Sequence, residues 1–157
     1  LLDIINKVLY HNILELNETK YMTITVMACS KNGKILFSGL HQDILIYRSD
    51  LQNIEIIETQ GKWLGIVDDA ENYNSSLKLN INDVMLLYTD GITEAWIKGS
   101  IKDHRGEKEM FGQSQLHSIF KNNGALSPSE IVQLLTNRLK KYDTEDDITL
   151  VVLKRLK

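Results

Sequence analysis

Two short acidic stretches hold the residues of this chain best suited to chemistry. Asp90 follows the apolar run 84–88 after a single residue, Thr89, and Asp146 and Asp147 directly precede the near-continuous apolar run 148–153. Such runs are typical of strands buried on both faces, so each acidic stretch is expected at the end of a rigid, central strand. Carboxylates in these positions can converge. Because neighbouring carboxylates repel one another, a hard cation such as Mg²⁺ or Mn²⁺ would stabilise them, and the pattern therefore suggests a metal site.

Both stretches also have simpler interpretations. Asp90-Gly91 after a strand is common turn chemistry, with Gly91 allowing a sharp change of direction. The segment 143–147 is rich in acidic residues, and such runs usually form solvated surfaces. Residue types and spacing alone leave these alternatives open.

The rest of the chain supplies elements that could position the carboxylates. Apolar residues at helical spacing predict one apolar helix face, and the Ser127-Pro128-Ser129-Glu130 sequence predicts a capped helix start. Asn32-Gly33 predicts a hairpin turn. These patterns predict an α+β fold with a mainly antiparallel sheet system and helices outside it. The expected helices are 1–16, 113–122 and 128–139, the expected strands are 20–29, 35–38, 44–47, 54–58, 77–81, 84–88 and 148–153, and the expected loops include 68–76 and 96–109.

Length and composition indicate one ordinary soluble domain over residues 1–157. Hydrophobic residues make up 43% of the chain and charged residues 25%, and the net charge of −3 argues against nucleic acid or an anionic membrane as a partner. No apolar run is long enough to span a membrane, and no signal peptide is recognisable. The single cysteine, Cys29, is expected to be a small buried residue in a reducing environment. The expected localisation is cytoplasmic.

Several motifs, in order along nearly the whole chain, resemble those of a known enzyme family. Segments 87–95 and 146–152 look like the two late signature motifs of metal-dependent PP2C-type serine/threonine phosphatases. More narrowly, they resemble the bacterial branch related to the sporulation stage II E phosphatase and the RsbU-type regulators. Segments 38–48, 63–66 and 110–116 are similar to further elements of that branch. The resemblance implies a PP2C-like αββα sandwich.

The resemblance also implies which residues bind metal. In the family, two Mn²⁺ or Mg²⁺ ions activate a water molecule that attacks phosphoserine or phosphothreonine directly, so no side-chain nucleophile is needed. Carried over to this sequence, Asp90 and Asp146 would be metal ligands. Asp147 is a weaker ligand candidate, and the alternative is that it only orients Asp146 or Thr149. Gly91 and Thr149 would support the ligands without binding the metal.

The loop 96–109 stands next to the predicted site. Lys102 and Arg105 in this loop could contact phosphate, so the loop is a candidate substrate flap. A variable surface connection is the alternative interpretation.

One family feature has no counterpart in this sequence. The family's early Asp-bearing strand and the glycine-rich turn after it are not found, which predicts that the chain is the C-terminal part of the family's domain and N-terminally incomplete. An open sheet edge would then allow a homodimer.

Membership of the bacterial branch implies a role in signal transduction. The implied substrate is a phosphorylated anti-anti-sigma factor or a similar regulatory protein in sigma factor regulation and stress response, with a sensor or receiver domain upstream. The alternative is a catalytically inactive phosphatase-like module that binds a phosphoprotein partner. This alternative follows from the motifs that are missing.

Overall fold

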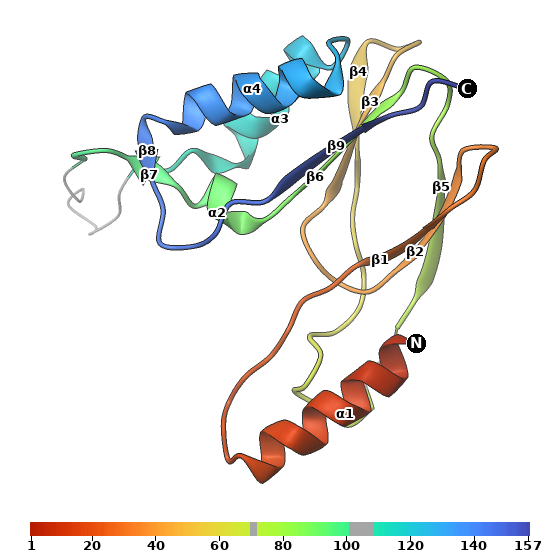
Figure 1. The fold of residues 1–157 in the computed structure, drawn as a ribbon, viewed down its shortest axis with the longest axis vertical. Helices are drawn as coiled ribbons and strands as arrows, with labels where there is room; N and C mark the ends of the chain where they lie inside the picture. The colour runs from red at the N-terminus through yellow and green to blue at the C-terminus, as the bar shows by residue number, and fades with distance from the viewer. Residues whose placement is uncertain (70–71, 101–108) are drawn as a thin grey trace. The chain divides into compact units, whose positions relative to one another are not determined.

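The computed structural model describes residues 1–69, 72–100 and 109–157. Within it the chain forms two compact units, one made of residues Leu1–Asp43 and Glu58–Lys78 and the other of Ile44–Ile57 and Leu79–Lys157. Figure 1 shows the elements of both units along the chain. Helices and antiparallel strands occur in each unit, which confirms the predicted α+β class.

The first unit contains one helix and a three-stranded antiparallel sheet in the order β1-β2-β5. The predicted hairpin is present, and Gly33 in its turn has a φ of 84°, a conformation that glycine adopts without strain. The first strand of the hairpin is shorter than the predicted 20–29, because regular pairing starts only at Val26. The elements are α1 (Leu2–Glu15), β1 (Val26–Cys29), β2 (Lys34–Ser38) and β5 (Asn74–Lys78).

Two boundaries in the first unit differ from the prediction. The polar segment Asn74-Ser75-Ser76 was expected in a loop, yet it forms most of β5 and pairs with β2. The expected strand 77–81 therefore starts and ends too late. β5 lies at one end of the sheet order, where a solvent-facing strand tolerates polar side chains because backbone pairing holds it.

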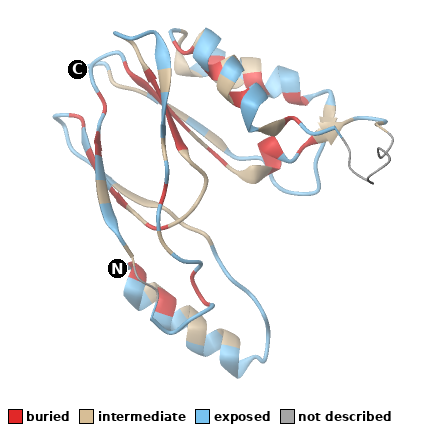
Figure 2. Cartoon of the chain, turned by 180° about the vertical axis from the view of Figure 1, so that it is seen from behind, coloured by how far each residue is buried: buried red, intermediate tan, exposed pale blue. Residues whose placement is uncertain are grey.

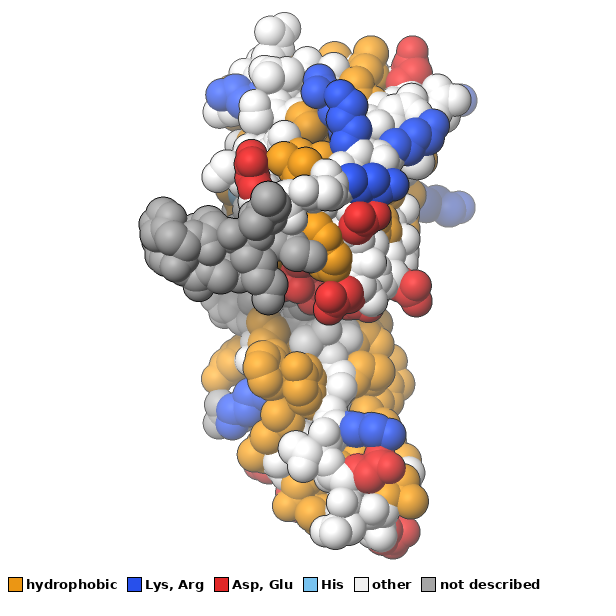
Figure 3. All heavy atoms as spheres, turned by 90° about the vertical axis from the view of Figure 1, so that its left-hand side faces the viewer, with side chains coloured by type: hydrophobic (Ala, Val, Ile, Leu, Met, Phe, Trp, Pro, Cys, Tyr) orange, Lys and Arg blue, Asp and Glu red, His pale blue; other side chains and the backbone are white. Residues whose placement is uncertain are grey.

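Helix α1 differs from the simple amphipathic helix that its spacing predicts. Leu2 packs against Leu64, but Val8 in the helix and Leu16 at its C-cap, which fit the same helical spacing, are 56% and 67% exposed. Hydrophobic side chains accordingly gather on the surface over α1 (Figure 3). Cys29 is also exposed, so the prediction of a buried cysteine is wrong. Helical periodicity predicts which side chains share one face of a helix, but it does not predict how much of that face another part of the protein covers.

A polar residue, Asn6, is one of the two buried residues of α1. Its side-chain amide donates to the carbonyl oxygens of Val67 and Asp68, each at 2.8 Å, and its carbonyl oxygen accepts from the Gly65 N–H at 2.9 Å. The three hydrogen bonds satisfy a fully buried amide and hold the loop 65–68 on the helix.

The second unit is built on a four-stranded antiparallel sheet in the order β4-β3-β6-β9. The central strands β3 and β6 are almost wholly buried, which confirms Val84–Tyr88 as a central strand (Figure 2). The elements are β3 (Ile44–Arg48), β4 (Asn53–Ile57), β6 (Val84–Tyr88), α2 (Asp90–Thr93), β7 (Trp96–Ile97), α3 (Gly112–Asn123), α4 (Pro128–Leu139), β8 (Tyr142–Asp143) and β9 (Leu150–Lys154).

Strand β9 is not the doubly buried strand that its apolar run predicts. It stands at the end of the strand order, and Val151 and Leu153 are 43% and 42% exposed, whereas Leu150 and Val152 pack on the core. In the described part of the chain, β6 is the strand that pairs with it. A continuous apolar run shows that both faces are apolar, but it does not show whether something covers both.

The start of the predicted loop 96–109 is also structured. Trp96 and Ile97 form β7, which pairs with β8, and the Ile97 N–H donates to the Glu109 carbonyl oxygen at 3.0 Å. The predicted flap residues Lys102 and Arg105 lie outside the described residues.

Helices α3 and α4 bury their apolar faces in the main core of the second unit, with Leu116, Phe120, Ile131 and Leu135 at most 1% exposed. The predicted cap of α4 is confirmed in both halves: Ser127 Oγ accepts from the Glu130 N–H, and the Glu130 carboxylate accepts from the Ser127 N–H at 2.8 Å. The hydrogen bonds from Ser127 lower the pKa of Glu130, because they favour its charged form.

We expect the Gly124→Ala variant to lose about 1–3 kcal/mol of unfolding free energy, because a methyl group there would overlap the ring of buried Tyr47. The φ of Gly124 is −64°, which alanine adopts freely, so the cost is steric. Urea unfolding measures it. In a Tyr47→Ala background, which removes the ring and leaves only the Cβ atom of residue 47 in the overlap, the same substitution should cost less, and equal costs in both backgrounds would contradict the steric cause.

Candidate metal centre

Asp90 is fixed at the junction of strand β6 and helix α2. It is half-buried and is the first residue of α2, one residue beyond Thr89 and two beyond the end of β6. The Asp90 carbonyl oxygen accepts from Thr93 Oγ1 at 3.1 Å and from the Glu94 N–H at 2.8 Å. Thr93 and Glu94 thus close this turn through their hydrogen bonds to the Asp90 carbonyl oxygen. A short helix held in this way keeps Asp90 on a rigid support.

Asp146 lies in an exposed loop that is closed by its own hydrogen bonds. Thr144 Oγ1 accepts from the Asp146 N–H at 3.1 Å and donates to the Asp146 carbonyl oxygen at 3.0 Å. One carboxylate oxygen of Asp146 accepts from the Asp147 N–H at 2.8 Å. Asp146 is thus ordered locally, and its second carboxylate oxygen can serve as a ligand.

The two acidic segments meet in the second unit. The Thr89 N–H donates to the Thr149 carbonyl oxygen at 3.0 Å, which continues the pairing of β6 and β9 one residue beyond Tyr88 and Leu150. A Cβ atom at Gly91 would lie 2.7 Å from the Asp147 carbonyl oxygen and 3.2 Å from that of Asp146. The backbone of α2 and that of the acidic loop are therefore in direct contact.

This contact explains why position 91 is occupied by glycine, and the explanation differs from the turn that the sequence suggests. From its sequence neighbours Gly91 is expected in a sharp turn, but it is a buried helical residue and is not among the glycines with positive φ. Glycine is required because the carbonyl oxygens of the acidic loop leave no room for a side chain. The structure thus brings together all five residues predicted for the metal centre: Asp90, Gly91, Asp146, Asp147 and Thr149.

The donor chemistry of this junction fits a hard divalent cation. Oxygen atoms of carboxylates and carbonyl groups are ligands that hard divalent cations prefer, and both kinds of group are present at this junction. Mg²⁺ is commonly bound by one or two carboxylates, with water and substrate phosphate completing its coordination shell. Within the described ranges no cluster of three or more His, Cys, Asp or Glu side chains is arranged to hold a metal. The carboxylates of Asp90 and Asp146 are therefore of the chemical type that such an ion prefers.

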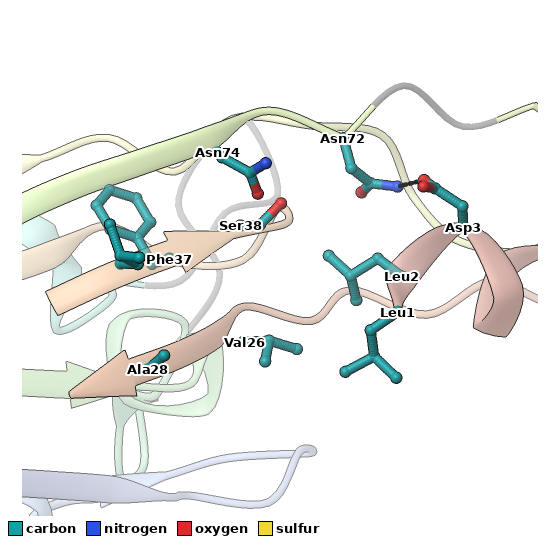
Figure 4. Close-up of a pocket in the computed structure, with 10 residues that line it drawn as sticks. Leu1, Leu2, Asp3, Val26, Ala28, Phe37, Ser38, Asn72 and Asn74 are labelled. Atoms are coloured by element: carbon teal, nitrogen blue, oxygen red, sulfur yellow. Dashed lines mark hydrogen bonds between the residues drawn. The ribbon is translucent and has the colours of Figure 1, made fainter. Parts of the chain in front are cut away.

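Other features of the chain do not contribute to this junction. A cavity of about 300 Å³ in the first unit is lined by Leu2, Val26, Phe37 and their neighbours, and at its rim Asn72 Nδ2 donates to the Asp3 carboxylate at 2.8 Å (Figure 4). His41 also belongs to the first unit, where its backbone exchanges hydrogen bonds with the Thr59 hydroxyl. None of the predicted metal-site residues lines that cavity.

Comparison with known proteins decides the family. The family model of stage II sporulation protein E (SpoIIE) matches residues 1–156. The chain belongs to this family. The phosphoserine phosphatase RsbU of Bacillus subtilis (strain 168) is 26% identical to this SpoIIE-family chain over an alignment of 152 residues, and the match covers 92% of this chain and 43% of RsbU. The predicted resemblance is thereby confirmed.

Solved structures confirm the PP2C-like fold. The SiaA-PP2C domain of Pseudomonas aeruginosa matches with a TM-score of 0.72 at 16% identity, covering 98% of this chain and 58% of that one. The phosphatase domain of SpoIIE from Bacillus subtilis matches with a TM-score of 0.61 at 20% identity, covering 98% of this chain and 65% of that one. The SpoIIE-family chain thus spans less than two thirds of these relatives. None of its described helices is long and apolar enough to cross a membrane.

Proposed function

We propose that this SpoIIE-family chain forms part of a metal-dependent phosphatase that hydrolyses phosphoserine or phosphothreonine on a protein. The observation that carries the proposal is the direct contact between the backbone that follows β6 and the backbone that precedes β9, which supports Asp90 and Asp146 as members of one site. The similarity to RsbU, a phosphoserine phosphatase, supports the same reaction.

In this proposal Asp90 and Asp146 hold the cation, with two Mn²⁺ or Mg²⁺ ions expected in a complete domain. When bound, such an ion polarises phosphoryl oxygens and lowers the pKa of a water molecule. The chain itself provides the geometry: α2 orients Asp90, the Thr144 hydroxyl orders the loop of Asp146, and the small Gly91 allows the two segments to approach. Asp147 and Thr149 support the ligands through their backbone groups.

The proposed substrate is a phosphorylated regulatory protein of the anti-anti-sigma type, acting in bacterial signal transduction. The similarity to RsbU and membership of the SpoIIE family support this class of substrate. A cytoplasmic location and an upstream sensor or receiver domain belong to the same proposal. Lys102 and Arg105 remain the candidates for contacting substrate phosphate.

The chain is expected to release inorganic phosphate from a phosphoserine peptide in the presence of Mn²⁺. Activity should disappear with a chelator and return when Mn²⁺ is added in excess, because the reaction depends on the ion at Asp90 and Asp146. Phosphate release is measured colorimetrically, with unphosphorylated peptide as the control. Hydrolysis that persists in the chelator would contradict a metal-dependent mechanism.

The second candidate function is a module that binds a phosphoprotein without hydrolysing it. The number of ligands favours it, since two carboxylates fill only part of the octahedral shell that Mg²⁺ prefers. The same peptide distinguishes the two candidates. Binding without phosphate release, measured by calorimetry in Mn²⁺, would select the binding module.

A further inference from the structure

The hydroxyl group of Thr89 has an unusual set of partners. Thr89 is the N-cap residue of α2, with φ −101° and ψ 159°, and a threonine there normally accepts a hydrogen bond from an N–H of its own helix. The Thr89 side chain makes no such cap. It accepts from the Thr149 N–H at 2.9 Å and donates to the Asp147 carbonyl oxygen at 3.0 Å. The hydroxyl therefore joins two segments that are distant in sequence.

This hydroxyl lies beside both predicted metal ligands. Thr89 directly precedes Asp90, and its acceptor Asp147 directly follows Asp146. The Asp147 carbonyl oxygen is also the atom that closely approaches Gly91. One carbonyl oxygen is thus held by Thr89 and packed against α2, at the point where the acidic loop meets the helix.

From these contacts we infer that Thr89 is a positioning residue, which sets the distance between Asp90 and Asp146 without binding the cation itself. The inference rests on the proposed metal-dependent function. A hydroxyl suits this role because it donates and accepts at the same time, which valine of nearly the same shape cannot do. The β-branch of threonine further restricts its χ1 angle, so both hydrogen bonds keep their directions.

The test compares three variants by their binding of Mn²⁺. Thr89→Val removes both hydrogen bonds, Thr89→Ser keeps the hydroxyl, and Thr136→Val makes the same change at an exposed position of α4. Paramagnetic broadening of backbone amide signals by added Mn²⁺ locates the ion and detects weak binding. In the wild type, signals of residues 90–93 and 144–149 should broaden first.

We expect Thr89→Val to raise the Mn²⁺ concentration needed for half-broadening roughly tenfold to a hundredfold, the usual effect of losing a group that orients a metal ligand. Thr89→Ser and Thr136→Val should remain close to the wild type. Equal Mn²⁺ binding by Thr89→Val and the wild type would overturn the inference. Wild-type spectra without broadening at residues 90–93 and 144–149 would instead contradict the metal site on which the proposed function depends.

A further variant covers the case in which Thr89→Val does not fold. Thr89→Cys is close to serine in shape, but its thiol is a weak hydrogen-bonding group. Folding of every variant is judged from the dispersion of its amide signals without metal. If Thr89→Cys binds Mn²⁺ as tightly as Thr89→Ser, the hydroxyl is not needed and the inference fails.

Discussion

Asp90→Asn is expected to reduce metal-dependent phosphate release by roughly hundredfold or more, at least as much as the loss of a group that only orients a metal ligand. Asparagine keeps the shape of the side chain but removes the charge that attracts the cation. Because Asp90 is the half-buried first residue of α2, a neighbouring side chain cannot move easily into its place. Asp146→Asn should have an effect of similar size.

A matched control lies in the same acidic segment. Asp143→Asn removes one charge near Asp146, but the Asp143 side chain is 53% exposed and 3.7 Å from Lys98 Nζ, a surface pair that contributes little to stability. Its rate should stay close to that of the wild type. Initial rates at several Mn²⁺ concentrations, with folding checked by circular dichroism, measure all three variants. An equal loss in Asp143→Asn would indicate a general charge effect instead of specific ligands.

The second large effect is expected at a buried ion pair in the second unit. Asp83 is 0% exposed, and one of its carboxylate oxygens lies 2.7 Å from Arg48 Nη1. The carboxylate also accepts from the Ser49 N–H at 3.0 Å and from the Asn80 N–H at 2.9 Å. The pair joins the end of β3 to the turn before β6, the strand that leads to Asp90.

Asp83→Ala should therefore lower the free energy of unfolding by roughly 3–5 kcal/mol, because it removes a buried carboxylate that accepts from a mostly buried guanidinium and from two N–H groups. The control is Glu55→Ala, which removes the other carboxylate partner of Arg48. Glu55 is 47% exposed, and its loss should cost about 1 kcal/mol or less. Urea unfolding followed by the fluorescence of Trp96, in a Trp63→Phe background, reports on the second unit. Equal losses in both variants would contradict the importance of burial.

The same carboxylate gives a pH dependence with a definite sign. Burial alone would raise the pKa of Asp83, but the hydrogen bonds from Ser49, Arg48 and Asn80 outweigh it and hold the pKa below its ordinary value of 3.8. As the pH falls, the unfolded state binds the proton first, so the stabilisation is complete above the ordinary value and is lost below it. The difference in unfolding free energy between wild type and Asp83→Ala should therefore be smaller at about pH 3 than at about pH 6.

Features that depend on neighbouring residues were predicted well from the sequence. The capped start of α4, the turn at Gly33 and the central strand Val84–Tyr88 all follow from residue types within a few positions of each other. Capping, backbone conformation and strand burial are local properties, or properties of a short run, so a single sequence contains the information. The order of the motifs along the chain was likewise enough to indicate the SpoIIE family.

Features that depend on distant partners were decided only by the tertiary structure. Asn6 and Asp83 are polar residues that look like surface positions, yet both are buried because their partners, up to 62 residues away in the sequence, satisfy them. Strand β9 has the sequence of a buried strand, but its place at the end of the sheet order leaves alternate residues exposed.

The candidate metal centre combines both kinds of information. Residue types and motif order were sufficient to name Asp90 and Asp146, since carboxylates next to apolar strands can be read directly from the sequence. The packing reason for Gly91 and the role inferred for Thr89 could not be read in this way, because each depends on the backbone of residues near 147, close to 60 residues further along the chain. Sequence determines which groups are available, whereas only the fold determines which distant backbone atoms they meet.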